Sequence, residues 1–70
     1  MTHTLEGRIR AAADAHEAAP TVETAHTLVD AYGALVGWLE TRGLRPHYAA
    51  RLKGRAQMHT QWAQAQGEKA

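Results

Sequence analysis

The sequence predicts an all-α fold, a small three-helix domain. Residues 21–42 and 46–66 are expected to form a long antiparallel helical hairpin, and residues 4–18 a shorter N-terminal helix. Apolar residues recur at steps of three and four through residues 22–39, which keeps them on one face of a helix. Helix breakers at Pro20, Gly43 and Pro46 divide the chain into three stretches. A chain of 70 residues forms one domain, and its last four residues, 67–70, are expected to be a loose polar tail.

The first helix has a narrow apolar stripe with few large side chains. Thr4 is its expected N-cap, and Glu6 suits the positive end of the helix dipole in the first turn. The stripe consists of Leu5, Ile9, Ala12 or Ala13, and His16. Only Leu5 and Ile9 are large, so we expect this helix to contribute little to the core.

The central helix is the one around which the chain is organised. Thr21 can cap it after Pro20, and its apolar seam is formed by Val22, Ala25, Val29, Tyr32, Val36 and Leu39, widened by Leu28 and Leu35. Gly33 and Gly37 share another face with His26 and Asp30. Because each glycine costs a helix about 1 kcal/mol relative to alanine, we expect a close neighbour there and therefore neighbours on two sides of this helix.

The turn after the central helix has the pattern of a Schellman motif. Gly43 stands directly after the helix, with Leu39 and Leu44 at the two positions whose apolar side chains accompany that motif. Pro46 suits the first position of the next helix. This short connection predicts that the second and third helices are antiparallel.

The third helix places Tyr48, Leu52, Ala56, His59 and Ala63 on its core face. A flank beside this face carries Arg51, Arg55, Met58 and Trp62. That flank could bind phosphates, with Trp62 for stacking, or form a protein interface, since tryptophan and arginine are enriched there. The alternative, which we favour, is that Met58 and Trp62 pack on the first helix near Leu5 or Ile9, and that both arginines pair with acids of the N-terminal half.

The charge is divided unevenly along the chain, although the net charge is only +1. Residues 1–41 carry six acidic and two basic side chains, whereas residues 42–70 carry six basic and one acidic. Such a division can indicate nucleic-acid or membrane contact. We favour mutual neutralisation of the two halves when they fold against each other.

Several classes of function receive no support from the sequence. The chain lacks cysteine and serine, has no glycine-rich phosphate loop, and spreads its acids over helix surfaces, so we expect no enzyme, no cofactor and no small-molecule substrate. The five histidines lack metal-ligand spacing, and the His26–Asp30 pair is too small for a metal site. We expect no membrane span and no secretory signal, and the cytoplasm as the compartment.

The sequence therefore favours a protein–protein interaction module that self-associates or docks on a larger assembly as an accessory, structural or inhibitory subunit. Small proteins of this kind occur in phages and mobile elements, among other places. Trp38, off the main seam, is either covered by the first helix, which we favour, or exposed for self-association. The expected interface residues are Gly33, Val36, Gly37, Trp38, Arg51, Arg55, Met58 and Trp62. The second hypothesis is nucleic-acid binding through Arg42, Arg45, Arg51, Lys53 and Arg55, although long helices and an antiparallel turn do not suit a helix-turn-helix.

Overall fold

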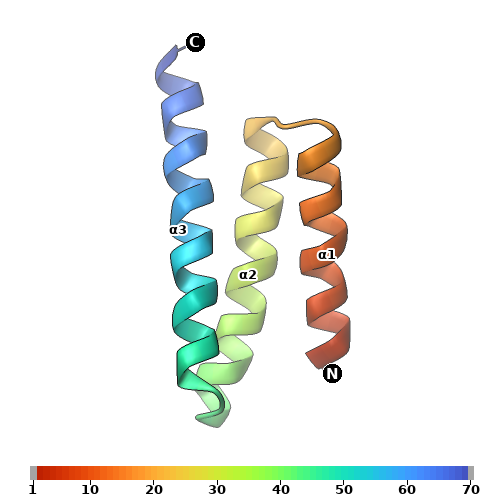
Figure 1. The fold of residues 1–70 in the computed structure, drawn as a ribbon, viewed down its shortest axis with the longest axis vertical. Coiled ribbons are helices and arrows are strands. Elements are labelled where there is room, and N and C mark those ends of the chain that lie inside the picture. Colours follow the sequence, from red (N-terminus) through yellow and green to blue (C-terminus); the bar gives the residue numbers. More distant parts are fainter. Residues whose placement is uncertain (1, 70) are drawn as a thin grey trace.

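The protein forms three α-helices joined by two short connections. The structure, a computed structural model, describes the backbone of residues 2–69 and the side chains of residues 4–68. Its helices are α1 (Thr2–Ala18), α2 (Val22–Arg42) and α3 (Pro46–Lys69). Figure 1 shows α2 between the other two, with α1 and α3 running in the same direction and α2 opposed to both. The predicted all-α fold and the antiparallel pairing of the second and third helices are confirmed.

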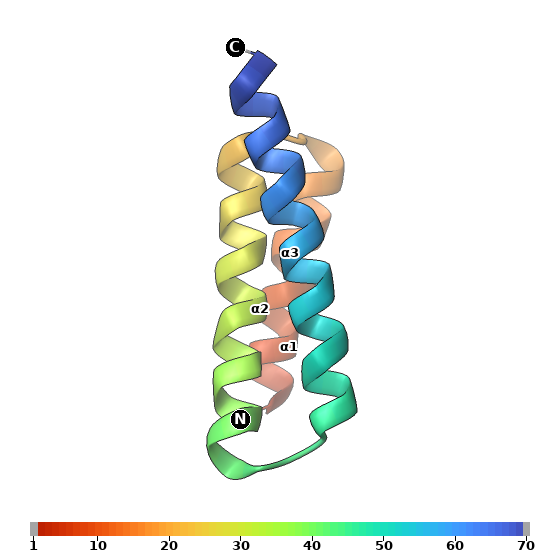
Figure 2. The same ribbon diagram turned by 90° about the vertical axis from the view of Figure 1, so that its left-hand side faces the viewer.

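The three helices form an open arrangement in which only α2 has two neighbours. The molecule measures 40 × 19 × 13 Å along its principal axes. Seen from the side in Figure 2, α2 lies to one side of α1 and α3. No Cα atom of α1 lies within 8 Å of a Cα atom of α3 over the described residues. The first and third helices are therefore held together mainly through α2.

Two predicted helix ends differ from the observed ones. The first helix begins at Thr2, so Thr4 lies inside the helix and is not its cap, and no acidic residue lies in the first turn. The third helix continues to Lys69, beyond its expected end at Gln66, and Ala70 lies outside the described residues. Extending an existing helix costs little per residue, because each added residue gains a hydrogen bond.

Thr21 caps α2, as the sequence predicts. Its backbone is extended, with φ −128°, and its Oγ1 accepts a hydrogen bond from the Thr24 backbone N–H at 3.0 Å. In return, the Thr21 backbone N–H donates to Oγ1 of Thr24 at 2.9 Å. Together these bonds form a capping box in which threonine takes the usual place of glutamate or glutamine.

The turn between α2 and α3 is the predicted Schellman motif. Gly43 adopts a left-handed conformation with φ 65°, and its N–H donates to the Glu40 carbonyl at 3.1 Å. The Leu44 N–H donates to the Leu39 carbonyl at 2.9 Å. Arg45 is also left-handed, with φ 46°, and its carbonyl accepts from the Ala49 N–H at 3.0 Å. The third helix then begins at Pro46, as predicted.

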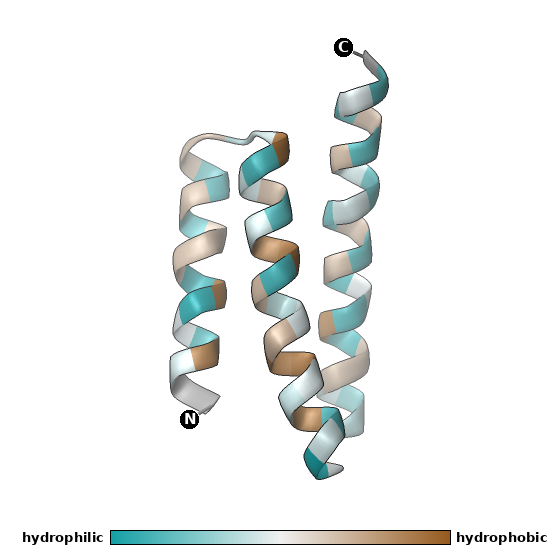
Figure 3. Ribbon diagram, turned by 180° about the vertical axis from the view of Figure 1, so that it is seen from behind, coloured by the Kyte–Doolittle hydropathy of each residue, from teal (hydrophilic) through white to brown (hydrophobic). Residues whose placement is uncertain are grey.

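The hydrophobic core takes in four of the six predicted seam residues (Ala25, Tyr32, Val36 and Leu39) and extends onto the flank of the seam. Leu28 and Leu35 are the most deeply buried large side chains, with exposed fractions of 2% and 0%. Val22 and Val29, which the sequence placed on the seam, are only half-buried. The shift arises because α1 and α3 approach α2 from two sides, so that the side chains between them are covered most completely. Figure 3 accordingly shows the strongest hydrophobic colouring along α2.

The outer helices contribute smaller side chains to this core. In α1, Ala12 is buried, and Leu5 and Ile9 pack against the core cluster. In α3, the buried residues are Ala49, Leu52 and Ala63. Small side chains on α1 and α3 cover α2 without filling the space between the two outer helices.

Candidate functional site

An open groove lies between α1 and α3, with α2 at its floor. Its volume is about 210 Å³. We call it the basic groove and define it by the residues that line it: Glu6, Ile9, Arg10, Tyr32, Tyr48, Arg51, Leu52 and Arg55. The groove exists because α1 and α3 are separated at this level.

The groove combines an apolar floor with cationic walls. Tyr32 and Leu52 lie at the floor but are buried, so the half-buried Ile9 and Tyr48 supply most of the accessible apolar surface. Arg51 and Arg55 stand one helical turn apart on the α3 wall. On the α1 wall, Glu6 and Arg10 are likewise four residues apart, and Glu6 is the acidic residue of the groove.

Further positive charge lies at one end of the groove. A shallow depression lined by Arg45, His47, Tyr48 and Arg51 adjoins the groove through the last two residues. The Arg45 guanidinium lies over the Tyr48 ring, 4.4 Å from the ring centroid. This cation–π contact holds Arg45 beside the groove.

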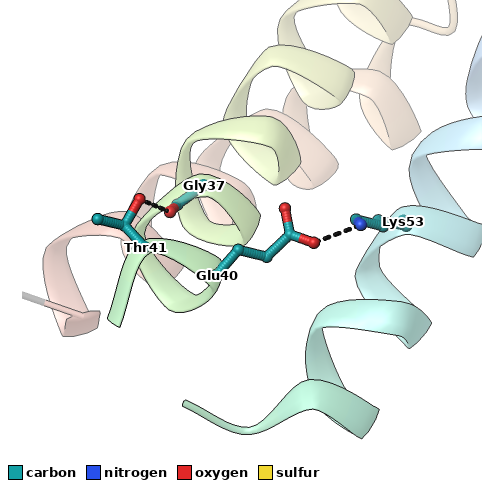
Figure 4. A network of polar contacts seen from close by, with 4 residues as sticks. All are labelled: Gly37, Glu40, Thr41 and Lys53. Carbon is teal, nitrogen blue, oxygen red and sulfur yellow. Dashed lines mark hydrogen bonds and ion pairs between the residues drawn. The ribbon is translucent and has the colours of Figure 1, made fainter. Parts of the chain in front are cut away.

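Among the described side chains, the acidic and basic halves of the chain neutralise each other through one direct ion pair. Lys53 and Glu40 form an ion pair between α3 and α2, which Figure 4 shows. Both partners are about half exposed, so this pair contributes little to stability. Arg51 and Arg55 have no acidic oxygen within 4.0 Å among the side chains of residues 4–68. The favoured prediction that both arginines pair with acids of the N-terminal half is therefore not met.

At its other end the groove is bounded by contacts between α1 and α3. The rings of His16 and Trp62 meet edge to face, with centroids 4.9 Å apart. His16 also approaches His59 with centroids 5.5 Å apart, and its Nδ1 lies 2.8 Å from Oγ1 of Thr24. Trp62 thus contacts the first helix, as predicted, but at His16 and not near Leu5 or Ile9.

Burial lowers the pKa of His59 below its ordinary value of 6.5, and the nearby His16 lowers it further. The Tyr32 ring is stacked with the His59 ring from the α2 side, with centroids 6.1 Å apart. The neutral form of His59 is therefore favoured in the folded protein. We call His16, His59 and Trp62 the histidine–tryptophan cluster.

The predicted interface residues fall into three separate places. Gly33 and Gly37 lie on the exposed face of α2, where a Cβ atom would meet nothing within 4 Å, so the expected close neighbour is not found within the chain. The Thr41 Oγ1 donates to the Gly37 carbonyl at 2.7 Å on this face (Figure 4). Val36 is buried in the core and so is not available to a partner.

Trp38 is half-buried and packs against the core, which is closer to the covered arrangement that we favoured. Its Nε1 is buried without a hydrogen-bond acceptor among the described residues, and the Arg42 guanidinium lies 4.9 Å from its ring centroid. The remaining four residues stay together on the flank of α3. Arg51 and Arg55 line the basic groove, Trp62 closes its end, and Met58 is 68% exposed beside them.

The five residues predicted for nucleic-acid binding do not form one surface. Arg42 lies over Trp38, and Lys53 is paired with Glu40 on a different side of α3 from Arg51 and Arg55. Arg45, Arg51 and Arg55 remain near one another along the groove. The predicted basic surface is therefore divided by its intramolecular contacts.

Sequence reasoning missed the contribution of the other two helices to this site. Glu6 and Arg10 come from α1, and Tyr32 comes from α2. A signal was present for α1, because Glu6 and Arg10 flank the stripe of Leu5 and Ile9 at helical spacing. This spacing indicates a shared site only once α1 and α3 are known to face each other across α2.

Comparisons with protein-family models, curated proteins and solved structures find no match to this chain. Within the described part of the chain, none of the helices is both long and apolar enough to cross a membrane. The same residues contain no group of three or more histidine, aspartate or glutamate side chains that could share a metal ion.

Proposed function

We propose that this protein is a small helical interaction module that docks a helix of a protein partner in the basic groove. The observation that carries the proposal is the gap between α1 and α3, where Ile9 and Tyr48 are only half-buried above the buried Tyr32 and Leu52. In four-helix bundles, antiparallel helices enclose a core from four sides. Three of these positions are filled here, and a partner helix over the groove would fill the fourth.

The dimensions of the groove suit a short helical segment. On the α3 wall the lining residues run from Tyr48 to Arg55, about two helical turns. Neighbouring helices pack with their axes about 8–10 Å apart. The histidine–tryptophan cluster joins α1 to α3 at one end, so a partner would lie along the open part beside Tyr48 and Arg51. Met58, largely exposed on the same flank, adds an apolar contact at the rim.

Docking on another protein is better supported than self-association through this groove. Two copies joined groove to groove would bring Arg10, Arg51 and Arg55 against the same residues of the second copy. Like charges across an interface oppose association, by several kcal/mol in unfavourable cases. Self-association through the exposed Gly33 and Gly37 face would leave the groove free for a partner.

The proposal can be tested by selecting helical peptides of unbiased charge that bind the full chain. The binding site is then mapped by the chemical shifts of backbone amides in the isotope-labelled protein. We expect selected peptides to shift Ile9, Tyr48 and Leu52, while Gly33 and Gly37 on the far face of α2 stay unchanged. The proposal fails if no peptide is selected, or if every binder maps away from the groove.

Nucleic-acid binding is the second candidate, because Arg45, Arg51 and Arg55 lie near one another along the groove. Binding to phosphates weakens steeply with salt, since each neutralised phosphate releases a counterion. Molar mass in solution, measured at two salt concentrations with and without duplex DNA, separates the two functions. A monomer that shifts only with DNA, and binds no helical peptide, would reverse our ranking.

A further inference from the structure

We infer that the helix docked in the basic groove is acidic and amphipathic, with two carboxylates spaced one turn apart on the edge that meets α3. This inference rests on the proposed function and names the class of partner. It follows from three properties of the groove: its uncompensated arginines, their spacing, and the apolar floor between its walls.

The arginines of the groove require a negatively charged partner once they are covered. Among residues 4–68, no carboxylate oxygen lies within 4.0 Å of the guanidinium groups of Arg10, Arg51 or Arg55. A neutral helix over the groove would remove water from these charges without replacing its hydrogen bonds, which is unfavourable. A carboxylate can accept two parallel hydrogen bonds from a guanidinium group and so compensates for the lost water.

The spacing of the charged residues along each wall determines the charge pattern of the partner. Arg51 and Arg55 are separated by about 6 Å along α3, four residues at 1.5 Å each. Two acidic residues four apart on the partner match this separation. On the α1 wall, Glu6 and Arg10 follow each other at the same spacing. The opposite edge of the partner is therefore expected to carry one basic and one acidic residue.

The floor requires an apolar seam between these two charged edges. Ile9 and Tyr48 are only half-buried and offer apolar surface that a leucine, isoleucine or methionine of the partner can cover, whereas Leu52 beneath them is already buried. A nucleic-acid backbone offers phosphates but no aliphatic seam, and Glu6 in the groove would repel phosphates. The floor and Glu6 thus favour a peptide helix over a nucleic acid.

A second copy of this chain does not fit these requirements. No two acidic residues of the chain lie four positions apart. The pair nearest to this spacing, Asp14 and Glu17, is exposed on α1 beside alanines such as Ala15 and Ala18, which offer little apolar surface. The partner is therefore a different protein.

The inference is tested with designed helical peptides that share one leucine seam and differ only at the edges. At two positions four apart on the edge that meets α3, one peptide carries glutamate, a second carries glutamine and a third carries lysine, while the edge that meets Glu6 and Arg10 is the same in all three. Each is titrated into the full chain at about physiological salt, and the site is mapped by backbone amide shifts. We expect the glutamate peptide to bind in the groove at least about tenfold more tightly than the glutamine peptide, and the lysine peptide not to bind.

Charge reversal in the protein provides the matched comparison. Arg51→Glu and Arg55→Glu should each weaken binding of the glutamate peptide about tenfold or more and allow the lysine peptide to bind. Arg8→Glu makes the same charge change on a face of α1 outside the groove and should leave both affinities nearly unchanged. Arg51→Gln and Arg55→Gln replace the charge-reversed variants if those do not fold. They should weaken binding of the glutamate peptide without allowing the lysine peptide to bind.

The outcomes separate this inference from the proposed function. If the three peptides bind in the groove with similar affinity, the acidic partner is excluded while helix docking stands. If none maps to the groove, both are excluded. If a glutamate peptide with an alanine seam binds as well as the leucine version, or duplex DNA displaces it at physiological salt, the groove is a general anion site and the inference is overturned.

Discussion

Gly43 and Gly33 show two different effects of glycine in this chain. Gly43 has φ 65°, a left-handed conformation that strains residues with a Cβ atom, and it places the two hydrogen bonds that end α2. Gly33 is an ordinary helical residue whose absent Cβ faces open space. The first glycine is required by the turn, whereas the second only weakens the helix.

Replacing these two glycines by alanine should therefore change stability in opposite directions. Gly43→Ala should lower the free energy of unfolding by about 1–2 kcal/mol, because alanine is strained at positive φ. Gly33→Ala should raise it by up to about 1 kcal/mol through helix propensity. Denaturant unfolding followed by circular dichroism measures both. A Gly33→Ala variant that is destabilised and has a lower molar mass in solution would show that a second copy packs on this face.

Burial of His59 between α1 and α2 makes the stability of the fold depend on pH. Its lowered pKa means that the unfolded chain takes up a proton near pH 6.5 while the folded protein still resists protonation. The free energy of unfolding is therefore highest above about pH 6.5 and falls as the pH drops through the lowered pKa of His59.

Thermal unfolding between pH 8 and pH 5 checks this dependence. His59→Gln should flatten the loss of stability toward low pH, since it removes the titrating ring from the histidine–tryptophan cluster. His47→Gln is the control, because His47 is exposed and lies outside the cluster. Equal pH dependence in the two variants would contradict the assignment to His59.

At the scale of the helices, the ends of α2 and the start of α3 could be predicted from the sequence. Thr21, Gly43 and Pro46 act through local backbone geometry and need no knowledge of the tertiary fold. The start of α1 could not be predicted in the same way, since Thr4 resembles a cap but the helix continues past it to Thr2. The third helix extends beyond Gln66 to Lys69 because polarity alone does not end a helix.

The helices also differ in how firmly they should be held. The first helix packs on α2 and reaches α3 only at the histidine–tryptophan cluster, whereas α2 is covered from two sides. Native-state hydrogen exchange should therefore show faster exchange of α1 amides than of amides in the middle of α2. Trp62→Ala should accelerate exchange in α1 further, while Met58→Ala, at a largely exposed side chain, should not. Uniform protection across all three helices would contradict this picture.

At the scale of the whole molecule, the groove could not be predicted because it depends on how α1 lies relative to α3. The alanine-rich stripe of α1 contains few large side chains, so the sequence did not determine which side of α2 it covers. The flank of Arg51, Arg55, Met58 and Trp62 was recognised, and it does face toward α1. Its arginines remained unpaired because the two outer helices stay apart at their level.

The ion pair of Lys53 with Glu40 has a practical consequence for studying the groove. Lys53 is held by this pair outside the groove, and each cationic side chain among the described residues that line the groove is an arginine. Coupling a dye or a solid support to Lys53 should therefore leave peptide affinity unchanged. Modification of arginine with phenylglyoxal should abolish it, and protection of Arg51 and Arg55 from the reagent by bound peptide would give a chemical footprint of the groove without any mutation.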